Sequence, residues 1–169
     1  IYYSNNIKNN KVVFMYFKIY DTVIGKIIIE ESDEEISRIE IVNGTEKFEG
    51  KEEKETELIN KTYKELDEYF NSKRKKFDIP LKIEGTEFQK KVWNALLEIP
   101  YGETRSYLDI AKRVGNPKAS RAVGMANHNN KIIIIIPCHR VIGSNKKLVG
   151  YAGGLDVKEK LLKLEQNCN

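Results

Sequence analysis

The stretch SYLDIAKRVGNPKASRAVGMAN, residues 106–127, decides the fold of the second half of the chain. Its apolar spacing predicts one helix from about Ser106 to Val114 and another from about Lys118 to Asn127. Gly115-Asn116-Pro117 separates them, because Gly and Pro end helices. A helix, a short turn that contains Gly and a second helix form the outline of a helix-turn-helix.

The second of these helices has an unusual surface for an element that reads nucleic acid. Its one long cation in the middle is Arg121, and its other residues are mostly small: Ala119, Ser120, Ala122, Gly124 and Ala126. Large polar side chains that read the edges of bases in the major groove are nearly absent. The small face fits a close approach to a narrow groove, and it equally fits tight packing against neighbouring helices.

Further helices are predicted on both sides of this pair. Thr86-Glu87-Phe88-Gln89 matches a capping box, in which Thr86 caps the helix and Gln89 reaches back to it. The helix that follows is expected to end at residues 99–102 and to bury Phe88, Val92, Trp93, Leu96 and Leu97. A last helix is predicted from Leu155 to about Gln166.

The first half of the chain reads as strands followed by a helix. Strands rich in β-branched and aromatic residues are predicted over Val12–Tyr20, Val23–Glu31 and Glu35–Val42. A helix is predicted from about Glu53 to Phe70, followed by an extended linker over 77–85. The fold class is therefore α/β (α+β). Residues 1–80 form an antiparallel sheet with a helix, and residues 85–169 form a mostly helical domain with a winged-helix-like helix-turn-helix.

Composition limits the class of protein further. The 169 residues are 40% hydrophobic and 32% charged, which is typical of a globular chain. No apolar run approaches the roughly 20 residues that cross a bilayer, and the first residues do not resemble a signal peptide. Cys138, Cys168, His128 and His139 have neither the number of a disulfide framework nor the spacing of zinc ligands. We therefore expect a cytoplasmic protein without membrane contact or metal, and a solvent-exposed Cys168.

Charge is distributed unevenly along the chain. Residues 100–169 contain 12 Lys and Arg against 5 Asp and Glu, whereas residues 1–99 contain 17 against 20. A basic second half favours contact with a polyanion such as nucleic acid, although a lysine-rich surface also simply keeps a protein soluble.

The most chemically informative stretch is IIIIIPCHRVIG, residues 132–143. It predicts a buried strand that ends at Pro137, with Cys138, His139 and Arg140 at its end. A thiol is a strong nucleophile only as thiolate, and nearby His or cationic groups lower its pKa. An inert core thiol is the alternative, but titratable neighbours are out of place in an inert core.

A cysteine protease would need a base that points at the thiol. Neighbours along an extended chain point to opposite sides, so His139 would act through a water unless the backbone turns sharply. Glu165 on the last helix could hold the imidazole; it could also be an ordinary solvated helix residue.

These motifs together resemble the methylated-DNA–protein-cysteine methyltransferases, the 6-O-alkylguanine-DNA alkyltransferases of direct DNA repair. The resemblance rests on IPCHRV at 136–141, GYAGGL at 150–155, KEKLL at 158–162, GNPKA at 115–119, RAVG at 121–124 and NHNN at 127–130. It covers residues 88–165 in the family's order and spacing. Zinc ligands that some relatives carry in the first half have no counterpart in this chain.

The resemblance implies a role for each matching residue in catalysis. Cys138 would accept the alkyl group, His139 would deprotonate it through a water, and Glu165 would orient His139. Tyr107 would donate a proton or hydrogen bond to the departing guanine, since a developing anion needs its charge neutralised. Lys158 would help to hold the thiolate.

The resemblance also implies how DNA would be bound. The target base must leave the stack, so Arg121 would fill the gap while its helix enters the minor groove. Other DNA contacts would be Tyr107, Leu108, Asn116, Ala119, Ser120, Ala122, Gly124 and Ser144. The alkylguanine pocket would be lined by Val141, Tyr151, Ala152 and Gly153. Asn130 would be the hinge that joins the helix-turn-helix to the active-site loop.

The function implied is stoichiometric repair of 6-O-methylguanine in double-stranded DNA, with 4-O-methylthymine left open as a second substrate. Each molecule would turn over once, as a monomer without a cofactor, because a thioether is a poor leaving group. The rival hypothesis is a non-catalytic module or regulator that binds alkylated bases. Family members of that kind lack the acceptor Cys, whereas this chain has Cys138.

Overall fold

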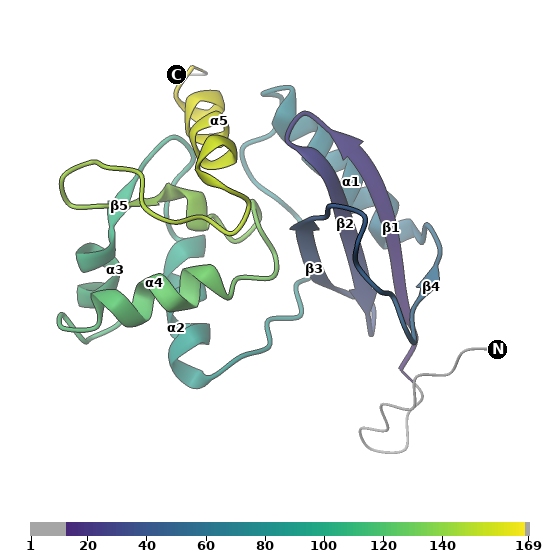
Figure 1. Cartoon of the computed structure of the whole chain (residues 1–169), viewed down its shortest axis with the longest axis horizontal. Coiled ribbons are helices and arrows are strands. Elements are labelled where there is room, and N and C mark those ends of the chain that lie inside the picture. The colour runs from purple at the N-terminus through teal and green to yellow at the C-terminus, as the bar shows by residue number, and fades with distance from the viewer. Residues whose placement is uncertain (1–12, 168–169) are drawn as a thin grey trace. The chain divides into compact units, whose positions relative to one another are not determined.

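The computed structural model describes residues 13–167, so Val12 at the predicted start of the first strand and Cys168 lie outside the described residues. The chain forms two compact units, the first ending at Lys82 and the second beginning at Ile83 (Figure 1). Together they give the mixed α/β class that the sequence predicts, with the sheet in the first unit and most helices in the second.

The first unit is built on a four-stranded sheet with the order β3-β2-β1-β4. Strands β1 (Met15–Thr22), β2 (Gly25–Ser32) and β3 (Glu35–Ile41) are antiparallel, as predicted. The two-residue β4 (Glu52–Glu53) instead runs parallel to β1. The β2–β3 turn places Asp33 and Glu34 at φ 55° and 62°, the left-handed conformation that tight hairpins require.

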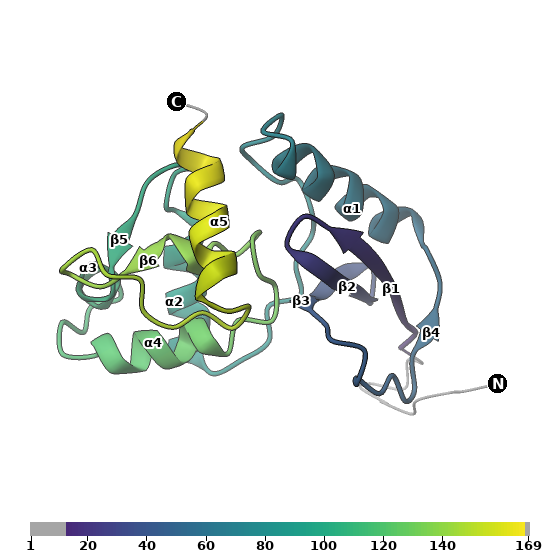
Figure 2. The ribbon, with the colours of Figure 1, turned by 45° about the horizontal axis from the view of Figure 1, so that its top comes forward.

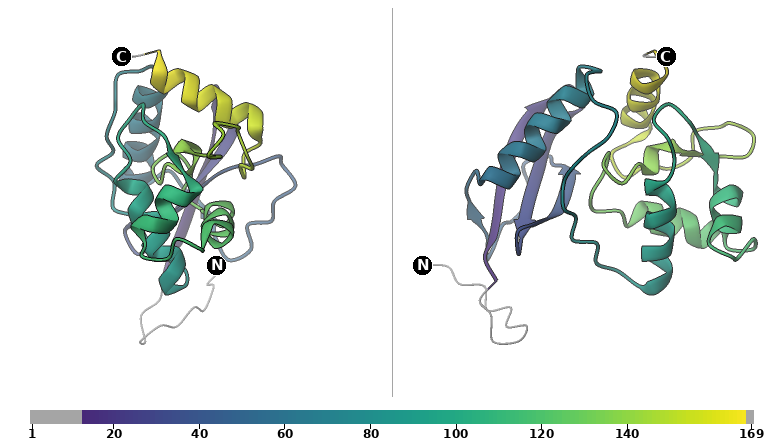
Figure 3. Two further views of the ribbon diagram at one scale, coloured as in Figure 1. Left: turned by 90° about the vertical axis from the view of Figure 1, so that its left-hand side faces the viewer. Right: turned by 180° about the vertical axis from the view of Figure 1, so that it is seen from behind.

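Helix α1 (Glu57–Phe70) covers one face of this sheet (Figure 3). It starts later than predicted, because Thr56 accepts a hydrogen bond from the Ile59 amide and so caps the helix. The helix buries Ile59, Leu66 and Tyr69. A separate cluster of Phe17, Ile28 and Val42 forms the core on the opposite face.

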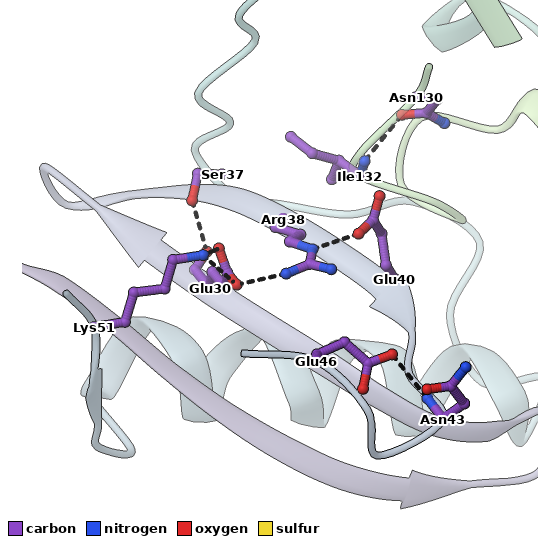
Figure 4. A network of polar contacts seen from close by, with 9 residues as sticks. All are labelled: Glu30, Ser37, Arg38, Glu40, Asn43, Glu46, Lys51, Asn130 and Ile132. Carbon is purple, nitrogen blue, oxygen red and sulfur yellow. Dashed lines mark hydrogen bonds and ion pairs between the residues drawn. The ribbon is translucent and has the colours of Figure 1, made fainter. Parts of the chain in front are cut away.

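Glu30 is a buried carboxylate beside that second cluster, and it is fully paired. Lys51 donates to both of its oxygens at 2.8 and 2.7 Å, and Arg38 donates to one of them at 2.9 Å (Figure 4). A buried charge is tolerated when it is paired in this way. The ionic group of Glu30, Lys51 and Arg38 therefore has a structural role.

The predicted linker over residues 77–85 begins as part of the first unit. Leu81 forms a parallel bridge with Ile36, whose amide donates to Pro80 O and whose carbonyl accepts from the Lys82 amide, both at 2.9 Å. The extended backbone that Pro80 favours is therefore used to cover the free edge of β3.

The second unit consists of helices α2 (Glu87–Leu97), α3 (Tyr107–Arg113), α4 (Ser120–His128) and α5 (Leu155–Gln166). A small parallel pair, β5 (Arg105–Ser106) and β6 (Val141–Ile142), joins distant parts of the chain (Figure 2). Helices α3 and α4 pack on each other and on α2 as a helix-turn-helix. The predicted capping box is present, with the Thr86 amide donating to Gln89 Oε1 at 2.9 Å.

Two predictions about the second unit are wrong. Leu97 is 42% exposed rather than buried, because the buried stripe of α2 runs through Val92 and Leu96 to Ile99, and Phe88 is only partly buried. The predicted strand at 132–136 is a series of turns, with Ile134 at φ 73°. All five isoleucines are buried. The run of β-branched residues therefore indicated a buried segment correctly but did not indicate its backbone conformation.

Asn130 closes that turn with its side chain. Its Oδ1 accepts from the Ile132 amide at 3.0 Å (Figure 4), and its Nδ2 donates to Ile136 O at 2.9 Å. A side chain that satisfies backbone groups in this way competes with strand pairing. Within residues 13–167, no helix combines the length and apolar character needed to span a membrane.

We expect Thr86→Ala to lower the free energy of unfolding by about 1 kcal/mol, because the first turn of α2 loses its side-chain cap. Thr86→Ser keeps the hydroxyl and serves as the matched control. Thermal unfolding of both variants measures the effect, and an equal loss in the two would assign it to the lost methyl group.

Candidate active site

Cys138 opens a short helical turn, η1 (Cys138–Arg140), and is 3% exposed. Asn130 Nδ2 lies 3.1 Å from Cys138 Sγ and donates to it. The backbone therefore turns sharply at the site instead of running straight. Cys138 and His139 therefore do not lie on an extended segment, in which neighbouring side chains point to opposite sides.

His139 belongs to a buried ionic cluster that is centred on Glu165. His139 Nε2 lies 2.7 Å from Glu165 Oε1, and both side chains are buried. Arg140 binds both carboxylate oxygens, at 2.9 Å through Nε and 3.0 Å through Nη2. The Gly102 amide donates to Oε2 at 3.1 Å. Glu165 is therefore a partner of His139, and the alternative of a solvated helix residue is wrong.

The cluster fixes the protonation of each member. Burial opposes ionisation of Glu165, but the hydrogen bonds and charges of His139 and Arg140 outweigh it and lower its pKa to about 2. Burial also lowers the pKa of His139 despite the carboxylate, so the imidazole is neutral at pH 7. An ionised carboxylate can only accept, which places the imidazole proton on Nε2 and leaves Nδ1 as the basic nitrogen.

Cys138 is a protonated thiol at rest. Burial raises its pKa to about 11, although the Asn130 hydrogen bond and the Lys158 charge act in the opposite direction. Burial likewise lowers the pKa of Lys158 to about 8, and the charge on Cys138 opposes that change. The thiol thus needs a base before it can act as a nucleophile.

Lys158 and Tyr107 meet at the same loop carbonyl. Lys158 Nζ donates to Val141 O at 2.6 Å and to Val149 O at 3.0 Å. Tyr107 OH donates to Val149 O at 2.9 Å. Lys158 is fully buried, and its ammonium holds the loop that precedes Tyr151 against β6. Lys158 therefore fixes the active-site loop through hydrogen bonds and also places a positive charge near the Cys138 thiol.

A cavity of about 370 Å³ opens beside the thiol. Its lining comes from α3, α4, η1 and the loop before α5, and consists of Tyr107, Ser120, Arg121, Gly124, Asn127, His128, Cys138, Val149, Gly150, Tyr151 and Ala152. A space of this size is within the range of small-molecule sites. The helix-turn-helix, the thiol and the loop at 149–152 therefore meet at one cavity.

The cavity includes some of the predicted residues and not others. Tyr107, Ser120, Arg121, Gly124, Tyr151 and Ala152 line it with Cys138. Val141 and Gly153 are outside the lining; Val141 is buried and offers its carbonyl to Lys158. Leu108, Asn116, Ala122 and Ser144 are exposed, and Ala119 is partly buried. Ser144 lines a separate groove with Arg105, Lys146 and Lys163.

Sequence reasoning missed several site residues. Asn127 and His128 line the cavity. Each lies seven residues, or two helical turns, after Ser120 and Arg121 respectively, so helical periodicity could have placed them on the same face. Arg140 holds Glu165, yet its role was hidden because its partner is 25 residues away. Among residues 13–167, no group of three or more His, Cys, Asp or Glu is placed to hold a metal ion.

A helix-turn-helix unit with a thiol at a cavity wall, next to a His–Glu pair, defines a cysteine-dependent group-transfer protein. Models of the two domains of 6-O-methylguanine DNA methyltransferase match the chain, the ribonuclease-like domain at residues 15–83 and the DNA binding domain at 87–167. The chain belongs to the methylated-DNA–protein-cysteine methyltransferase family, and it is a methyltransferase.

Individual relatives agree over nearly the whole length. The chain is 53% identical to the methylated-DNA–protein-cysteine methyltransferase of Methanosarcina acetivorans, over 91% of this chain and all of that one. Its structure is similar to that of Mycobacterium tuberculosis O6-methylguanine methyltransferase, with a TM-score of 0.81, 38% identity, and 92% and 95% of the two chains covered. A structure of Mycobacterium tuberculosis OGT in complex with DNA matches with a TM-score of 0.80 and 39% identity, over 90% and 94%.

We expect Glu165→Gln to lower the free energy of unfolding by about 3–5 kcal/mol at pH 7, because Arg140 then remains buried without a counter-charge. The depressed pKa of Glu165 also stabilises the protein above pH 4.5, and this contribution is lost as the pH falls toward 2. The variant should therefore lose less stability than wild type across that range.

Glu159→Gln on the same helix is the matched control, since Glu159 is exposed and its ion pair with Lys163 is exposed as well. Denaturant unfolding of the three proteins at several pH values measures both effects. Equal stability of the two variants at pH 7 would contradict the central role of Glu165.

Proposed function

We propose that this chain repairs double-stranded DNA by transferring the alkyl group of 6-O-methylguanine to Cys138. The observation that carries the proposal is Cys138 at the wall of a cavity shared with Tyr107 and the α4 face. The neutral His139, held by Glu165, supplies the base that a thiol with a pKa of about 11 requires. A module that only binds alkylated nucleobases would need neither the Cys138 thiol nor His139 as a proton acceptor.

The reaction conserves atoms and charge. His139 Nδ1 takes the Cys138 proton through a water, and the thiolate attacks the alkyl carbon from the side opposite O6. The carbon–sulfur bond forms as the carbon–O6 bond breaks. The electron pair of the carbon–O6 bond stays on guanine, which takes up one proton. The thioether of Cys138 is a poor leaving group, so each molecule turns over once.

Tyr107 changes its hydrogen-bond partner during this reaction. Its hydroxyl donates to Val149 O in the free protein, and in the complex it donates to the base as guanine departs. The Val149 carbonyl keeps Lys158 as its donor, so the exchange leaves no buried acceptor unpaired. Burial and the Cys138 charge raise the pKa of Tyr107, which keeps its proton available.

DNA binding is proposed for the α4 face. Arg121 is exposed at the cavity, where it fills the gap that the flipped nucleotide leaves, and Ser120 and Gly124 allow the close approach. Leu108, Asn116, Ala119, Ala122 and Ser144 contact the flanking DNA. The base lies against Tyr151 and Ala152, and Asn130 joins α4 to the thiol as the hinge. A single chain supplies every part of this site, and we propose that the protein acts as a monomer. Its proposed location is the cytoplasm.

We expect Cys138→Ser to bind duplex DNA like wild type and to transfer no alkyl group, because an alcohol is far less ionised than a thiol. The measurement is the intact mass of each protein after incubation with an oligonucleotide that contains 6-O-methylguanine. Wild type should gain one methyl group at Cys138, located by peptide mapping. Methylation of the variant would show that another residue accepts the group.

We expect Arg121→Ala to slow repair of duplex DNA by more than about tenfold, because extruding a stacked base costs a few kcal/mol. The rate with free 6-O-benzylguanine should stay unchanged, since that substrate is not stacked. Arg113→Ala removes the same charge from α3 outside the cavity and is the control. Equal losses on both substrates would contradict the intercalating role of Arg121.

A further inference from the structure

Asn127 is a buried polar residue in the last turn of α4, and the mechanism above does not use it. It is 7% exposed and lines the cavity. Neither its Nδ2 nor its Oδ1 has a hydrogen-bond partner among residues 13–167. Asn130, three residues later, satisfies its amide with two backbone groups and the thiol. The side-chain amide of Asn130 therefore stabilises the free protein through hydrogen bonds, whereas that of Asn127 does not.

Buried polar groups are almost always paired, because each unpaired one costs folding stability. An amide that lacks partners in the free protein and lies at a ligand cavity is a group held ready for the ligand. The torsion that turns the amide of Asn is broad and soft, so either amide atom can reach the cavity without a change in the backbone.

The position of Asn127 along α4 indicates which part of the substrate it meets. One turn before it, a Cβ added to Gly124 would lie 3.9 Å from the ring of Tyr107, the residue assigned to the base. Two residues past the end of α4, Asn130 donates to Cys138 Sγ. Residues three apart lie on one side of a helix, so Asn127 shares the face of Gly124, and it lines the same cavity as Tyr107 and Cys138. The edge of the base that carries the transferred group passes this point.

We propose that Asn127 is a substrate-binding residue whose Nδ2 donates to the N1–O6 edge of the alkylated base. This inference rests on the proposed function. Alkylation at O6 removes the hydrogen from N1, so N1 and O6 are both acceptors that an amide donor complements. When the carbon–O6 bond breaks, the electron pair develops on the same edge. The donor then stabilises the departing base until it takes up its proton, which makes the contact stronger during the reaction than before it.

The experiment uses Asn127→Leu in the full chain, because Leu has a similar shape and no hydrogen-bonding group. Transfer from 6-O-methylguanine in duplex DNA should slow about tenfold, the effect of one good hydrogen bond. The thermal unfolding temperature should stay equal or rise, because an unpaired amide is removed. The rate of Cys138 alkylation by iodoacetamide, which has no base, should stay unchanged. Asn94→Leu on the exposed side of α2 is the control and should leave all three unchanged.

Two further substrates locate the contact on the base. 6-O-Methylhypoxanthine keeps N1 and O6 but lacks the amino group of guanine, so Asn127→Leu should slow it by the same factor. A loss confined to guanine would assign the contact to the amino group and overturn the N1–O6 assignment. Free 6-O-benzylguanine should also slow by that factor, which separates the effect from base extrusion.

The remaining outcomes overturn the inference. An unchanged transfer rate would show that the amide does not touch the substrate. A lower unfolding temperature, or slower reaction with iodoacetamide in proportion to transfer, would make Asn127 a structural residue. If wild type itself transferred no methyl group, the proposed function would fail first, and that result is distinct from any of these.

Discussion

The carboxylate of Glu165 accepts hydrogen bonds from two separate segments of the second unit and so joins both of them to α5. The donors are His139 and Arg140 of η1 and the Gly102 amide of the turn after α2. Arg140 extends the same network to Ile99 O at 2.6 Å. Each ion would be costly to bury alone, so the cluster is stable only when complete. The position of Cys138 depends on it, because the thiol belongs to the turn that this cluster holds.

The same burial that makes the cluster necessary also sets the reactivity of the site. Burial raises the pKa of Cys138 to about 11, so it is not a thiolate in the free protein. A residue that can be used only once is thereby protected from other electrophiles and oxidants, whose reactions follow thiolate character. Asn130 and Lys158 already favour the thiolate, and the neutral His139 is ready to take the proton. Activation thus requires transfer of the thiol proton through a water to His139, which creates a thiolate beside an imidazolium that Glu165 stabilises.

Local patterns were sufficient to predict most of the fold. The strands of the first unit, both helices of the helix-turn-helix and the cap at Thr86 follow from periodicity and from residues within four positions of each other. Two features were not predictable in this way. The isoleucine run at 132–136 turns because the side chain of nearby Asn130 pairs with its backbone, a contact that β-branched composition does not reveal. Glu165 is buried because Arg140, 25 residues away, lies opposite it. The PCHR motif identified Cys138 and His139, and the family resemblance implied six further residues of the lining. The fold was needed to add Asn127, His128, Val149 and Gly150 and to show that α3, α4 and the loop before α5 meet at one cavity.

Two residues that line the cavity carry buried polar groups without a hydrogen-bond partner. The hydroxyl of Tyr151 and the amide of Asn127 are buried and unpaired among residues 13–167, and both residues line the cavity. By contrast, the buried carboxylate of Glu30, in the sheet of the first unit, is paired with Lys51 and Arg38. A chain selected for stability alone would replace two such groups with apolar ones of the same shape. Their presence beside the thiol is what a site requires when its hydrogen bonds are completed by an extruded base, since unpaired groups in the free protein become binding energy in the complex.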